Sequence, residues 1–415
     1  MHPKPKQTEQ VVELDLAVIG GGIAGLWLMN RLRAQGYQCA LFEKAGLGSD
    51  QTMASQGMIH GGIKYTLSGS LSRASESIAD MPDYWSRCLA GEGDVDLRAA
   101  RVLSRHFHFW SSDGLSSRMS TFFASKAMQG RIEKIAPARY PSLLKQPEFS
   151  GNVYQLNDIV LDVSSVLRAL AANLKERLFL LPGDKYRWRR NSDGNRAELL
   201  IETDGQPLLI RAKQFAFTAG KGNGDLLAAL AIGKPRMQLR PVHQVWVKHD
   251  FPHEFFGHCL GADTTPRISI STHPASDGSR VWSLGGSVAE AGAKQSTSEV
   301  IAAAQREMKQ LLPWVDLNGA HWTAARIDRA EARQRNFLRP DKAFAKSAEG
   351  IDNVIIGWPT KLTLAPNLAN EVLQILEQRE LVPSACDDLP ALRTLPPPPL
   401  AQAPWEAAFG KNHAY

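Results

Sequence analysis

Residues 14–25 of the chain read LDLAVIGGGIAG, an apolar run that ends in clustered glycines. A run with so few polar residues is typical of a buried parallel strand, which is apolar on both faces. Gly20, Gly22 and Gly25 have the spacing G-x-G-x-x-G. Apolar residues then recur at helical spacing up to Gly36, which is placed to end a helix. The stretch predicts a strand, a tight glycine turn and a helix.

A second short strand that ends in an acid follows this helix. Residues 38–43 read QCALFE, and Glu43 lies 18 residues beyond Gly25 (43 − 25 = 18). In a dinucleotide-binding unit the glycines allow the turn, the approach of the pyrophosphate and close helix packing, while the acid binds ribose hydroxyls. The helix N-terminus attracts the pyrophosphate because its N–H groups are unpaired and its dipole end is positive. We therefore predict a dinucleotide site; a glycine-rich turn of another α/β protein is the alternative.

Composition and charge describe an ordinary globular protein. The 415 residues are 43% hydrophobic and 22% charged, enough for two or three domain-sized units. The net charge is +6, and the densest basic cluster, Arg187, Arg189 and Arg190, stands beside the turn-like residues 191–195. A solvated hairpin explains that cluster better than a nucleic-acid site. The charge favours a small anionic substrate and at most a peripheral membrane contact, and we do not expect nucleic acid as a partner.

Cysteine and histidine spacing favours neither disulfides nor a metal. The four cysteines are far apart and form no C-x-x-C pair: Cys39, Cys88, Cys259 and Cys386. His106 and His108 would share one face of a strand, but a zinc site needs further ligands, so we expect no metal. The N-terminus has no apolar signal core, and no window reaches about 18 apolar residues. We expect a cytoplasmic protein in a reducing compartment.

The segment after the second strand is unusual. Residues 52–65 read TMASQGMIHGGIKY, in which small residues surround His60, Lys64 and Tyr65. A glycine-rich turn with a structural histidine is one interpretation. The position directly after a dinucleotide fingerprint favours a functional loop.

The fingerprint, Glu43 and residues 55–65 together resemble the D-amino-acid oxidase superfamily of FAD enzymes. The Ile-His-Gly-Gly segment, residues 59–62, is most similar to FAD-dependent glycerol-3-phosphate dehydrogenases. The continuation to residue 71 resembles L-2-hydroxyglutarate dehydrogenases. The resemblance implies FAD rather than NAD, and an α/β fold: a Rossmann-like FAD-binding domain of the glutathione-reductase type with an antiparallel β-sheet substrate or cap domain. It also implies that the loop runs along the flavin and lines the substrate pocket.

Later segments fit the same fold. Residues 214–220 predict a buried strand that runs into a second glycine turn, which in the superfamily returns the chain to the FAD domain. Residues 236–286 contain successive strands separated by turns, which predicts an antiparallel sheet. Residues 353–366 resemble the C-terminal motif that closes on the flavin, although Trp358-Pro359-Thr360 stands where small glycines are common.

Shorter local patterns predict individual elements. Asp162 is placed as the N-cap of a helix over residues 163–174. Another helix is expected over 299–312. Residues 197–201 and 208–212 predict a hairpin around the turn Asp204-Gly205.

These assignments divide the chain into three parts. We expect a discontinuous FAD-binding domain formed by residues 11–75, 151–235 and 320–380. The substrate or cap domain comprises residues 76–150 and 236–319. Residues 381–415, with four consecutive prolines, are expected to form an irregular tail on the surface.

The resemblance also implies the residues that hold the cofactor. They are Gly20, Gly22, Ile23, Ala24, Gly25, Glu43, Lys44, Thr52, Ser55, Gln56, Gly57, Met58, His60, Gly61, Ala219, Gly220, Gly357, Thr360, Lys361, Leu362 and Thr363.

The residues expected to act on substrate are His60, His243, Lys64, Tyr65, Arg326 and Lys361. Lys64 and Tyr65 fall where glycerol-3-phosphate dehydrogenases have arginine and tyrosine. Arg326 and Lys361 fall on their anion-binding arginine and lysine. Converging cations would bind a phosphate or carboxylate, Arg326 in bidentate fashion.

The expected reaction is oxidation of a CH–OH or CH–NH bond of a small anionic substrate by hydride transfer to flavin N5. The substrate would be a hydroxy acid, a glycerol-3-phosphate-like compound or an amino acid. His60 or His243 is expected to take the heteroatom proton, and a neutral amine would need no base. Oxygen, a quinone or another acceptor would reoxidise the flavin. Two alternatives stay open: an amine oxidase acting on a modified nucleic acid, and a flavin-binding scaffold without turnover.

Overall fold

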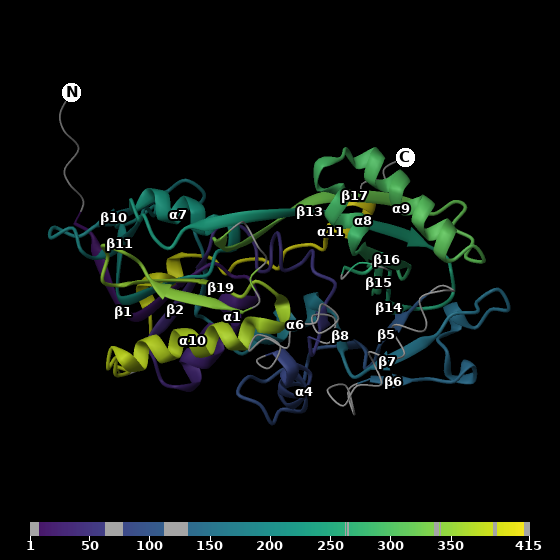
Figure 1. Ribbon diagram of the computed structural model, residues 1–415. Helices are drawn as coiled ribbons and strands as arrows, with labels where there is room; N and C mark the ends of the chain where they lie inside the picture. Colours follow the sequence, from purple (N-terminus) through teal and green to yellow (C-terminus); the bar gives the residue numbers. More distant parts are fainter. Residues whose placement is uncertain are drawn as a thin grey trace.

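The computed structural model describes most of the chain. The described residues are 8–62, 78–111, 132–261, 263, 265–335, 340, 342–384 and 388–410. Two large β-sheets organise them (Figure 1). The long strand β13 (Met237–His249) extends from the side of the first sheet to the second.

The first sheet is built on the predicted opening strand, β1 (Gln10–Ile19). β1 pairs in parallel with β2 (Cys39–Glu43) on one side and with β12 (Leu208–Phe217) on the other. β9 (Leu178–Leu180) extends the sheet beyond β2, and β19 (Val354–Trp358) extends it beyond β12. The five central strands are parallel and largely buried, which confirms the Rossmann-like prediction.

Antiparallel strands complete this sheet. β10 (Tyr186–Arg190) and β11 (Ala197–Ile201) pair beside the first half of β12, and β18 (Phe344–Ser347) pairs with β19. The predicted hairpin of residues 197–201 and 208–212 is therefore confirmed. Its second strand, β12, continues to Phe217. The strand predicted over 208–212 and the strand predicted within 214–220 are therefore one continuous strand.

Helices cover one face of the first sheet. α1 (Ile23–Ala34) packs against α10 (Ala365–Gln378) and α6 (Val163–Ala172), as Figure 1 shows for α1 and α10. Asp162 caps α6 as predicted, because its carboxylate accepts the N–H of Ser164. The opposite face packs against α7 (Asn223–Ala229) and the 3₁₀ turn η8 (Pro390–Thr394).

The second sheet is antiparallel except for one parallel pair, β14 with β5. Its strands, in spatial order, are β17 (His321–Ala332), β13, β16 (Arg280–Gly285), β15 (Ile268–Pro274), β14 (Phe256–Cys259), β5 (Phe107–Trp110), β7 (Val153–Leu156) and β6 (Ile132–Lys134). α8 (Ser287–Ala291) and α9 (Thr297–Leu311) lie beside it. A capping box between Ser296 and Glu299 begins α9.

Smaller elements connect the two sheets. β3 (Met58–Ile59), β8 (Ile159–Leu161) and β4 (Val102–Ser104) form a three-stranded sheet, and α4 (Met81–Ala90) packs beside β3.

Strand pairing differs from the predicted division of the chain at two places. β7 and β17 pair within the second sheet, although residues 151–235 and 320–380 were assigned to the FAD-binding part. Strand length explains the second case, because β17 follows β13 over twelve paired positions. The division into domains stays a proposal, with these two strands moved to the substrate part.

The C-terminal segment is more ordered than the proline-rich sequence predicts. It contains η8 and α11 (Pro404–Phe409) within the described residues. Leu47 pairs with it on both sides, donating to Pro399 O at 2.8 Å and accepting from Ala401 N at 3.0 Å. Trp405 is 6% exposed and its ring lies 6.5 Å from that of Trp246 in β13. The segment runs from the first sheet to the second.

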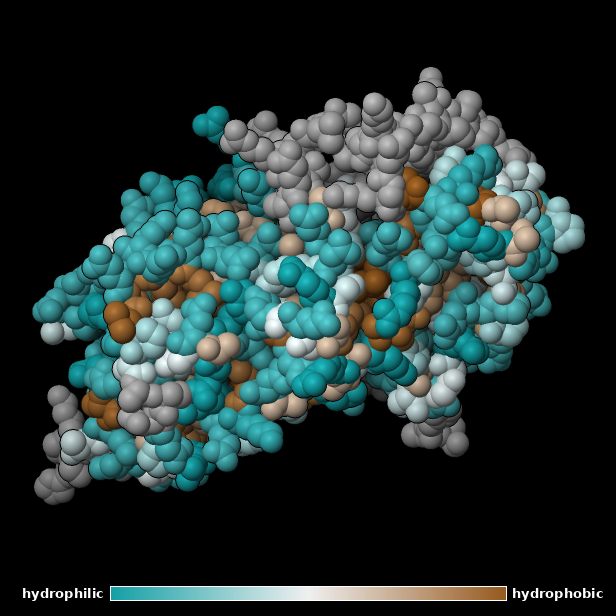
Figure 2. Space-filling model, turned by 90° about the horizontal axis from the view of Figure 1, so that it is seen from below, coloured by the Kyte–Doolittle hydropathy of each residue, from teal (hydrophilic) through white to brown (hydrophobic). Residues whose placement is uncertain are grey.

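The surface and the cysteines agree with the composition. Figure 2 shows a mainly hydrophilic face in which hydrophobic residues are visible in recesses. In the part of the chain that the structure describes, no helix is long and apolar enough to cross a membrane. Cys39, Cys88 and Cys259 are buried free thiols, and Cys386 lies outside the described residues. Among the described residues no group of His, Cys, Asp and Glu could hold a metal ion.

Candidate active site

A cavity of about 850 Å³ lies between the two sheets. Its lining begins at β10 and the carboxyl ends of β1 and β2, and reaches β13, β14 and β17 of the second sheet. This volume is in the range of cofactor and ligand sites. Open α/β sheets bind ligands outside the carboxyl ends of their strands, so the position is the expected one.

The glycine turn fits closely against its neighbours. Gly20 has φ +106°, and a β-carbon added there would lie 2.5 Å from Ala219 Cα. A β-carbon at Gly25 would lie 2.0 Å from Gly20 O. Only glycine avoids both clashes, which supports the roles that the spacing suggested: Gly20 makes the turn and Gly25 lets α1 pack on it.

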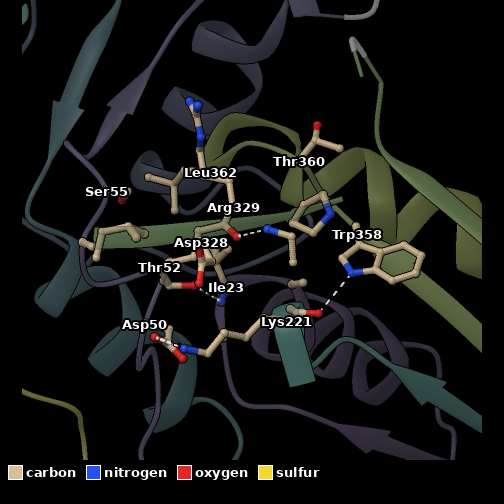
Figure 3. Close-up of a pocket in the computed structure, with 18 of the residues that line it drawn as sticks. Ile23, Asp50, Thr52, Ser55, Lys221, Asp328, Arg329, Trp358, Thr360 and Leu362 are labelled. Carbon is tan, nitrogen blue, oxygen red and sulfur yellow. Dashed lines mark hydrogen bonds and ion pairs between the residues drawn. The ribbon is translucent and has the colours of Figure 1, made fainter. Parts of the chain in front are cut away.

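The N-terminus of α1 faces the cavity. Gly22 is the N-cap residue and has no side chain of its own to cap the helix, and no acid stands in the first turn. The N–H of Ile23 donates to Thr52 Oγ1 at 3.3 Å, a contact visible in Figure 3. Helix N–H groups directed at a cavity, without a competing acid, suit a pyrophosphate.

Glu43 holds the turn in place. Its Oε2 accepts the N–H of Gly21 at 2.6 Å and its Oε1 accepts the N–H of Ala45 at 2.9 Å. The side chain is buried but still lines the cavity. Lys44, next to it, lies 3.9 Å from Asp225 in an exposed pair.

Hydrogen bonds from the Asn223 side chain hold the Ala219-Gly220 turn in place. The fully buried Asn223 accepts the N–H of Ala219 at 2.9 Å and donates to Phe217 O and Gly357 O at 3.2 Å each. Trp358 Nε1–H donates to Gly220 O at 3.1 Å, as Figure 3 shows. These contacts join the second glycine turn to the closing strand β19.

The two loops expected to meet at the flavin are hydrogen-bonded to each other. Thr363 Oγ1 accepts the N–H of His60 at 3.3 Å and donates to Met58 O at 3.2 Å. The N–H of Gly61 donates to the buried Asp158 at 2.9 Å. His60 and Lys361 are both buried and line the cavity.

Thr360 adopts the conformation of a glycine. Its φ is +62°, and the N–H of Lys361 donates across it to Pro359 O at 2.7 Å. The resemblance predicted small glycines here, and the observed backbone explains why glycine would suit the position.

The second sheet contributes a row of residues to the cavity wall. In register, His258 pairs with Ser269 and Ser269 with Gly285, and all three line the cavity. Gln244 also lines it and donates to Ser283 Oγ at 2.9 Å. Gln56 reaches over from the first sheet's loop and donates to Ser283 O at 2.8 Å.

Two arginines face each other at the same wall. Arg240 in β13 stands opposite Arg329 in β17, and both line the cavity. Arg240 binds the buried Glu331 with Nε–Oε1 3.1 Å and Nη2–Oε2 3.3 Å. Glu290 Oε1 lies 3.9 Å from Arg240 Nη1 and 3.6 Å from Arg329 Nη1. The pair therefore holds a half-exposed carboxylate between its guanidinium groups.

Most predicted cofactor residues line this cavity. They are Gly20, Gly22, Ile23, Ala24, Glu43, Lys44, Thr52, Ser55, Gln56, Gly57, Met58, His60, Ala219, Gly220, Thr360, Lys361, Leu362 and Thr363. Gly25, Gly61 and Gly357 lie behind the lining and support neighbouring backbone. Lys64 and Tyr65 lie outside the described residues.

Two predicted substrate residues are misplaced. His243 is absent from the described lining, because it is on the opposite face of β13 and approaches Gly292 O through Nδ1 at 3.3 Å. Arg326 is also absent from that lining; its side chain is 57% exposed and pairs with Asp328 at 3.1 Å. Of the three cations expected to converge, Arg326 therefore lies outside the described lining, Lys361 lies in it, and Lys64 is outside the described residues.

Arg240, Arg329 and His258 are cavity residues that the sequence did not indicate. His258 is 3% exposed, and its ring lies 4.6 Å from that of Phe107 and 5.6 Å from that of Phe109. The alternation along β13 separated Gln244 from His243, but it could not tell which face meets the cofactor.

The residues present fit FAD. The cradle at Gly20 and Gly25 excludes side chains, the α1 N-terminus at the cavity has no acid in its first turn and so suits a pyrophosphate, and Glu43 lines the cavity where it could bind a ribose. The buried cation of Lys361 lies at the opposite loop, where it would stabilise negative charge on a reduced ring.

The fold and site therefore define a dinucleotide-dependent flavoenzyme. A family model described as FAD dependent oxidoreductase matches residues 15–352, and the chain belongs to this family of FAD enzymes. The predicted resemblance, the cofactor and the enzyme class are confirmed.

Individual relatives are also FAD-dependent oxidoreductases by name. A probable FAD-dependent oxidoreductase of Pseudomonas aeruginosa is 45% identical over 401 residues, 96% of this chain and 99% of the relative. The crystal structure of an FAD dependent oxidoreductase from that organism superposes with TM-score 0.82 at 41% identity, covering 97% of this chain and 100% of the other.

Two further solved structures share the fold at low identity. Glycine oxidase of Geobacillus kaustophilus gives TM-score 0.62 at 15% identity, covering 92% and 98% of the chains. L-alpha-glycerophosphate oxidase of Mycoplasma pneumoniae, with FAD bound, gives TM-score 0.62 at 14% identity, covering 88% and 95%.

Proposed function

We propose that this chain oxidises a CH–NH or CH–OH bond of a small substrate that carries a carboxylate or phosphate. FAD supplies the hydride acceptor, N5 of the flavin, when bound. The observation that carries this proposal is the arginine pair Arg240 and Arg329 at the wall of the cavity.

The arginine pair is suited to bind the anionic end of a substrate. Both side chains are about four-fifths buried, so their charges are only partly screened. Glu290, which is 39% exposed, already places a carboxylate oxygen within 4 Å of both guanidinium groups. The contacts to Glu290 exceed hydrogen-bond length, so a substrate anion at 2.7–2.9 Å, the usual charge-assisted distance, would bind better.

Apolar side chains separate the anion site from the polar row of the sheet. Val242 and Ile327 are directly opposite each other beside the arginines, and Gln244 is two residues further along β13. An apolar wall excludes water from the reacting carbon and leaves orientation to the polar groups at either end.

His60 and His258 are the proton acceptors that we propose for an alcohol substrate. His60 comes from the loop beside Thr363, and His258 from the row on β14. We no longer propose His243 as a proton acceptor, because its side chain lies on the face of β13 opposite to the cavity. A neutral amine already carries the lone pair that drives hydride loss, so an amine substrate would not require either histidine.

The cofactor residues follow from the cavity. We propose that the α1 N-terminus holds the pyrophosphate, Glu43 binds the ribose, and Thr360, Lys361 and Leu362 contact the flavin. The fold relatives act, by name, on glycine and on glycerophosphate, which brings both substrate classes into the proposal.

Anaerobic reduction tests the proposal directly. The FAD-loaded protein is mixed with amino acids, 2-hydroxy acids and glycerol 3-phosphate, and flavin absorbance near 450 nm is followed. We expect bleaching with members of one class. Absence of bleaching across all three would overturn the substrate assignment.

Arginine variants locate the anion site. Arg329→Met should raise KM by about 10–100-fold, the loss of one or two charge-assisted hydrogen bonds, while FAD stays bound. Arg139→Met, an exposed arginine paired with Glu133, is the matched control and should leave KM unchanged. Equal KM values in both variants would contradict the role of Arg329.

A further inference from the structure

A second concave site lies beside the active-site cavity. The groove has a volume of about 1070 Å³ and is formed by residues around the start of β13, the end of β17 and β18. We call it the cationic groove, and its charged residues within the described chain are Lys234, Arg236, Arg333, Arg335, Lys346 and Glu349. Five of these six are cations, whereas the whole chain has 48 basic and 42 acidic residues.

Glu349 is the one acid among the described residues that line the groove, and it offsets little of their positive charge. Glu349 lies 3.5 Å from Lys234, and both side chains are more than half exposed. Exposed pairs of this kind contribute between 0 and about 1 kcal/mol. A concave surface lined by one sign of charge concentrates counter-ions, so the groove attracts anions more strongly than a flat surface would.

The fold places two of the cations side by side. Met237 pairs with Ala332 at the end of the β13–β17 ribbon, and one residue further the N–H of Arg333 donates to Arg236 O at 2.9 Å. Like charges opposite each other across a strand pair are destabilising. The two arginines therefore place like charges at the same end of the ribbon, an arrangement that a bound anion would stabilise.

The groove also contains neutral hydrogen-bond donors, and one of its walls is a packed aromatic ring. Ser347 and Gln334 line it, and the ring of Phe344 lies 5.9 Å from that of Trp358, which lines the active-site cavity. Lys346 Nζ lies 5.8 Å over the Phe344 ring. An aromatic contact thus stands between the two sites.

We infer that the cationic groove binds a small ligand with several phosphate groups, of the size of a nucleoside polyphosphate. Phosphate oxygens are acceptors only, and planar guanidinium groups match them in bidentate fashion. The groove has the volume of a ligand site and not the long basic stripe that a nucleic-acid strand follows. This inference is independent of the substrate proposed for the cavity.

A fluorescent ATP analogue carrying a methylanthraniloyl group tests the inference with the FAD-saturated protein in low salt. FAD saturation keeps the analogue out of the cavity, and no substrate is added, so the result does not depend on turnover. We expect saturable binding that inorganic pyrophosphate reverses. Arg236→Ala with Arg335→Ala should weaken it at least about tenfold.

The control removes the same charge elsewhere. Arg98→Ala with Arg139→Ala deletes two exposed arginines that pair with Asp96 and Glu133 and are not part of the groove lining, and it should change binding less than about twofold. Flavin absorbance reports whether each variant keeps its cofactor. If the double alanine variant loses FAD, Arg335→Gln and Lys346→Gln are measured singly and should each weaken binding.

Three outcomes would overturn the inference. These are the absence of saturation in the wild-type protein, an equal loss in the control variant, and stronger binding of a 12-nucleotide RNA or an octa-aspartate peptide that pyrophosphate does not reverse. The last outcome would assign the groove to a macromolecular polyanion.

Discussion

The main-chain N–H of His60 donates to the hydroxyl oxygen of Thr363 at 3.3 Å, although 303 positions separate the two residues. The same hydroxyl donates to Met58 O at 3.2 Å. One buried side chain therefore joins the loop after β2 to the motif after β19, the two segments that we propose contact the flavin.

Thr363→Val keeps the shape of this side chain and removes both hydrogen bonds. We expect a loss of stability of about 1–3 kcal/mol, because a buried N–H and a buried carbonyl lose their partner. FAD should dissociate about tenfold more readily. Thermal unfolding and FAD titration measure the two effects.

Thr203→Val provides the matched control. Thr203 donates to Gln206 O in an exposed turn, where water replaces the lost hydrogen bond. Its stability should change by less than about 0.5 kcal/mol. If Thr363→Val behaves like this control, Thr363 does not hold the loops together.

Gly25→Ala should prevent FAD binding. The added β-carbon would lie 2.0 Å from Gly20 O, so α1 must move away from the turn. We expect a cost above about 3 kcal/mol, at the upper end of overpacking effects. Gly233→Ala is the control, because no heavy atom lies within 4 Å of its added β-carbon. Retention of FAD by Gly25→Ala would refute the turn geometry.

Thr360→Gly should stabilise the protein relative to Thr360→Ala. A non-glycine residue at φ +62° is strained by about 1–2 kcal/mol, and both threonine and alanine bear that strain. Glycine also gives the unfolded chain more conformational freedom, which lowers the free energy of unfolding by about 0.4–1 kcal/mol and offsets part of the relieved strain. Urea unfolding of both variants should differ by about 0.5–1 kcal/mol, and a more stable alanine variant would contradict the reasoning.

Two buried histidines predict acid sensitivity. Burial lowers the pKa of His273 to about 4, and burial, with a smaller effect of Arg280, lowers the pKa of His249 to about 4. The unfolded chain takes up the proton near pH 6.5, so stability is unaffected above that value and falls between pH 6.5 and 4. Each histidine contributes a loss of roughly 3 kcal/mol over this window.

His249→Gln tests the histidine effect. Glutamine can still accept the N–H of Phe251, which donates to His249 Nδ1 at 3.1 Å. The free energy of unfolding should then fall less steeply between pH 6.5 and 4, by up to about 3 kcal/mol. His321→Gln replaces an exposed histidine and should leave the wild-type slope. If the free energy of unfolding fell equally steeply with pH in the wild type and in both variants, His249 would not be a cause of the acid sensitivity.

Local patterns along the chain indicated the residues that we propose hold the cofactor. Gly20, Gly25 and Glu43 belong to one strand–turn–helix–strand unit, and their roles follow from spacing because neighbouring residues fix that geometry. The loop at His60 and the motif at Lys361 were also found, since each carries its own unusual composition.

The substrate half could not be predicted in the same way. His243 and Gln244 are neighbours on β13, and alternation places them on opposite faces whichever face meets the cavity. Packing decides the face: Gly292 approaches His243 on one side, while Ser283 binds Gln244 on the other. Arg326 was assigned by resemblance, and the β13–β17 register instead brings Arg329 opposite Arg240.

The sequence by itself determined the fold class and the glycine turn that we propose binds the dinucleotide, because these depend on residues close together in the chain. Spacing did not separate FAD from NAD; the resemblance of residues 55–65 to the superfamily did. The tertiary structure alone decided which side chains of the second sheet line the cavity. Arg240, His258 and Arg329 come from three strands, and their convergence depends on strand register and on the packing of the two sheets, which no local spacing encodes.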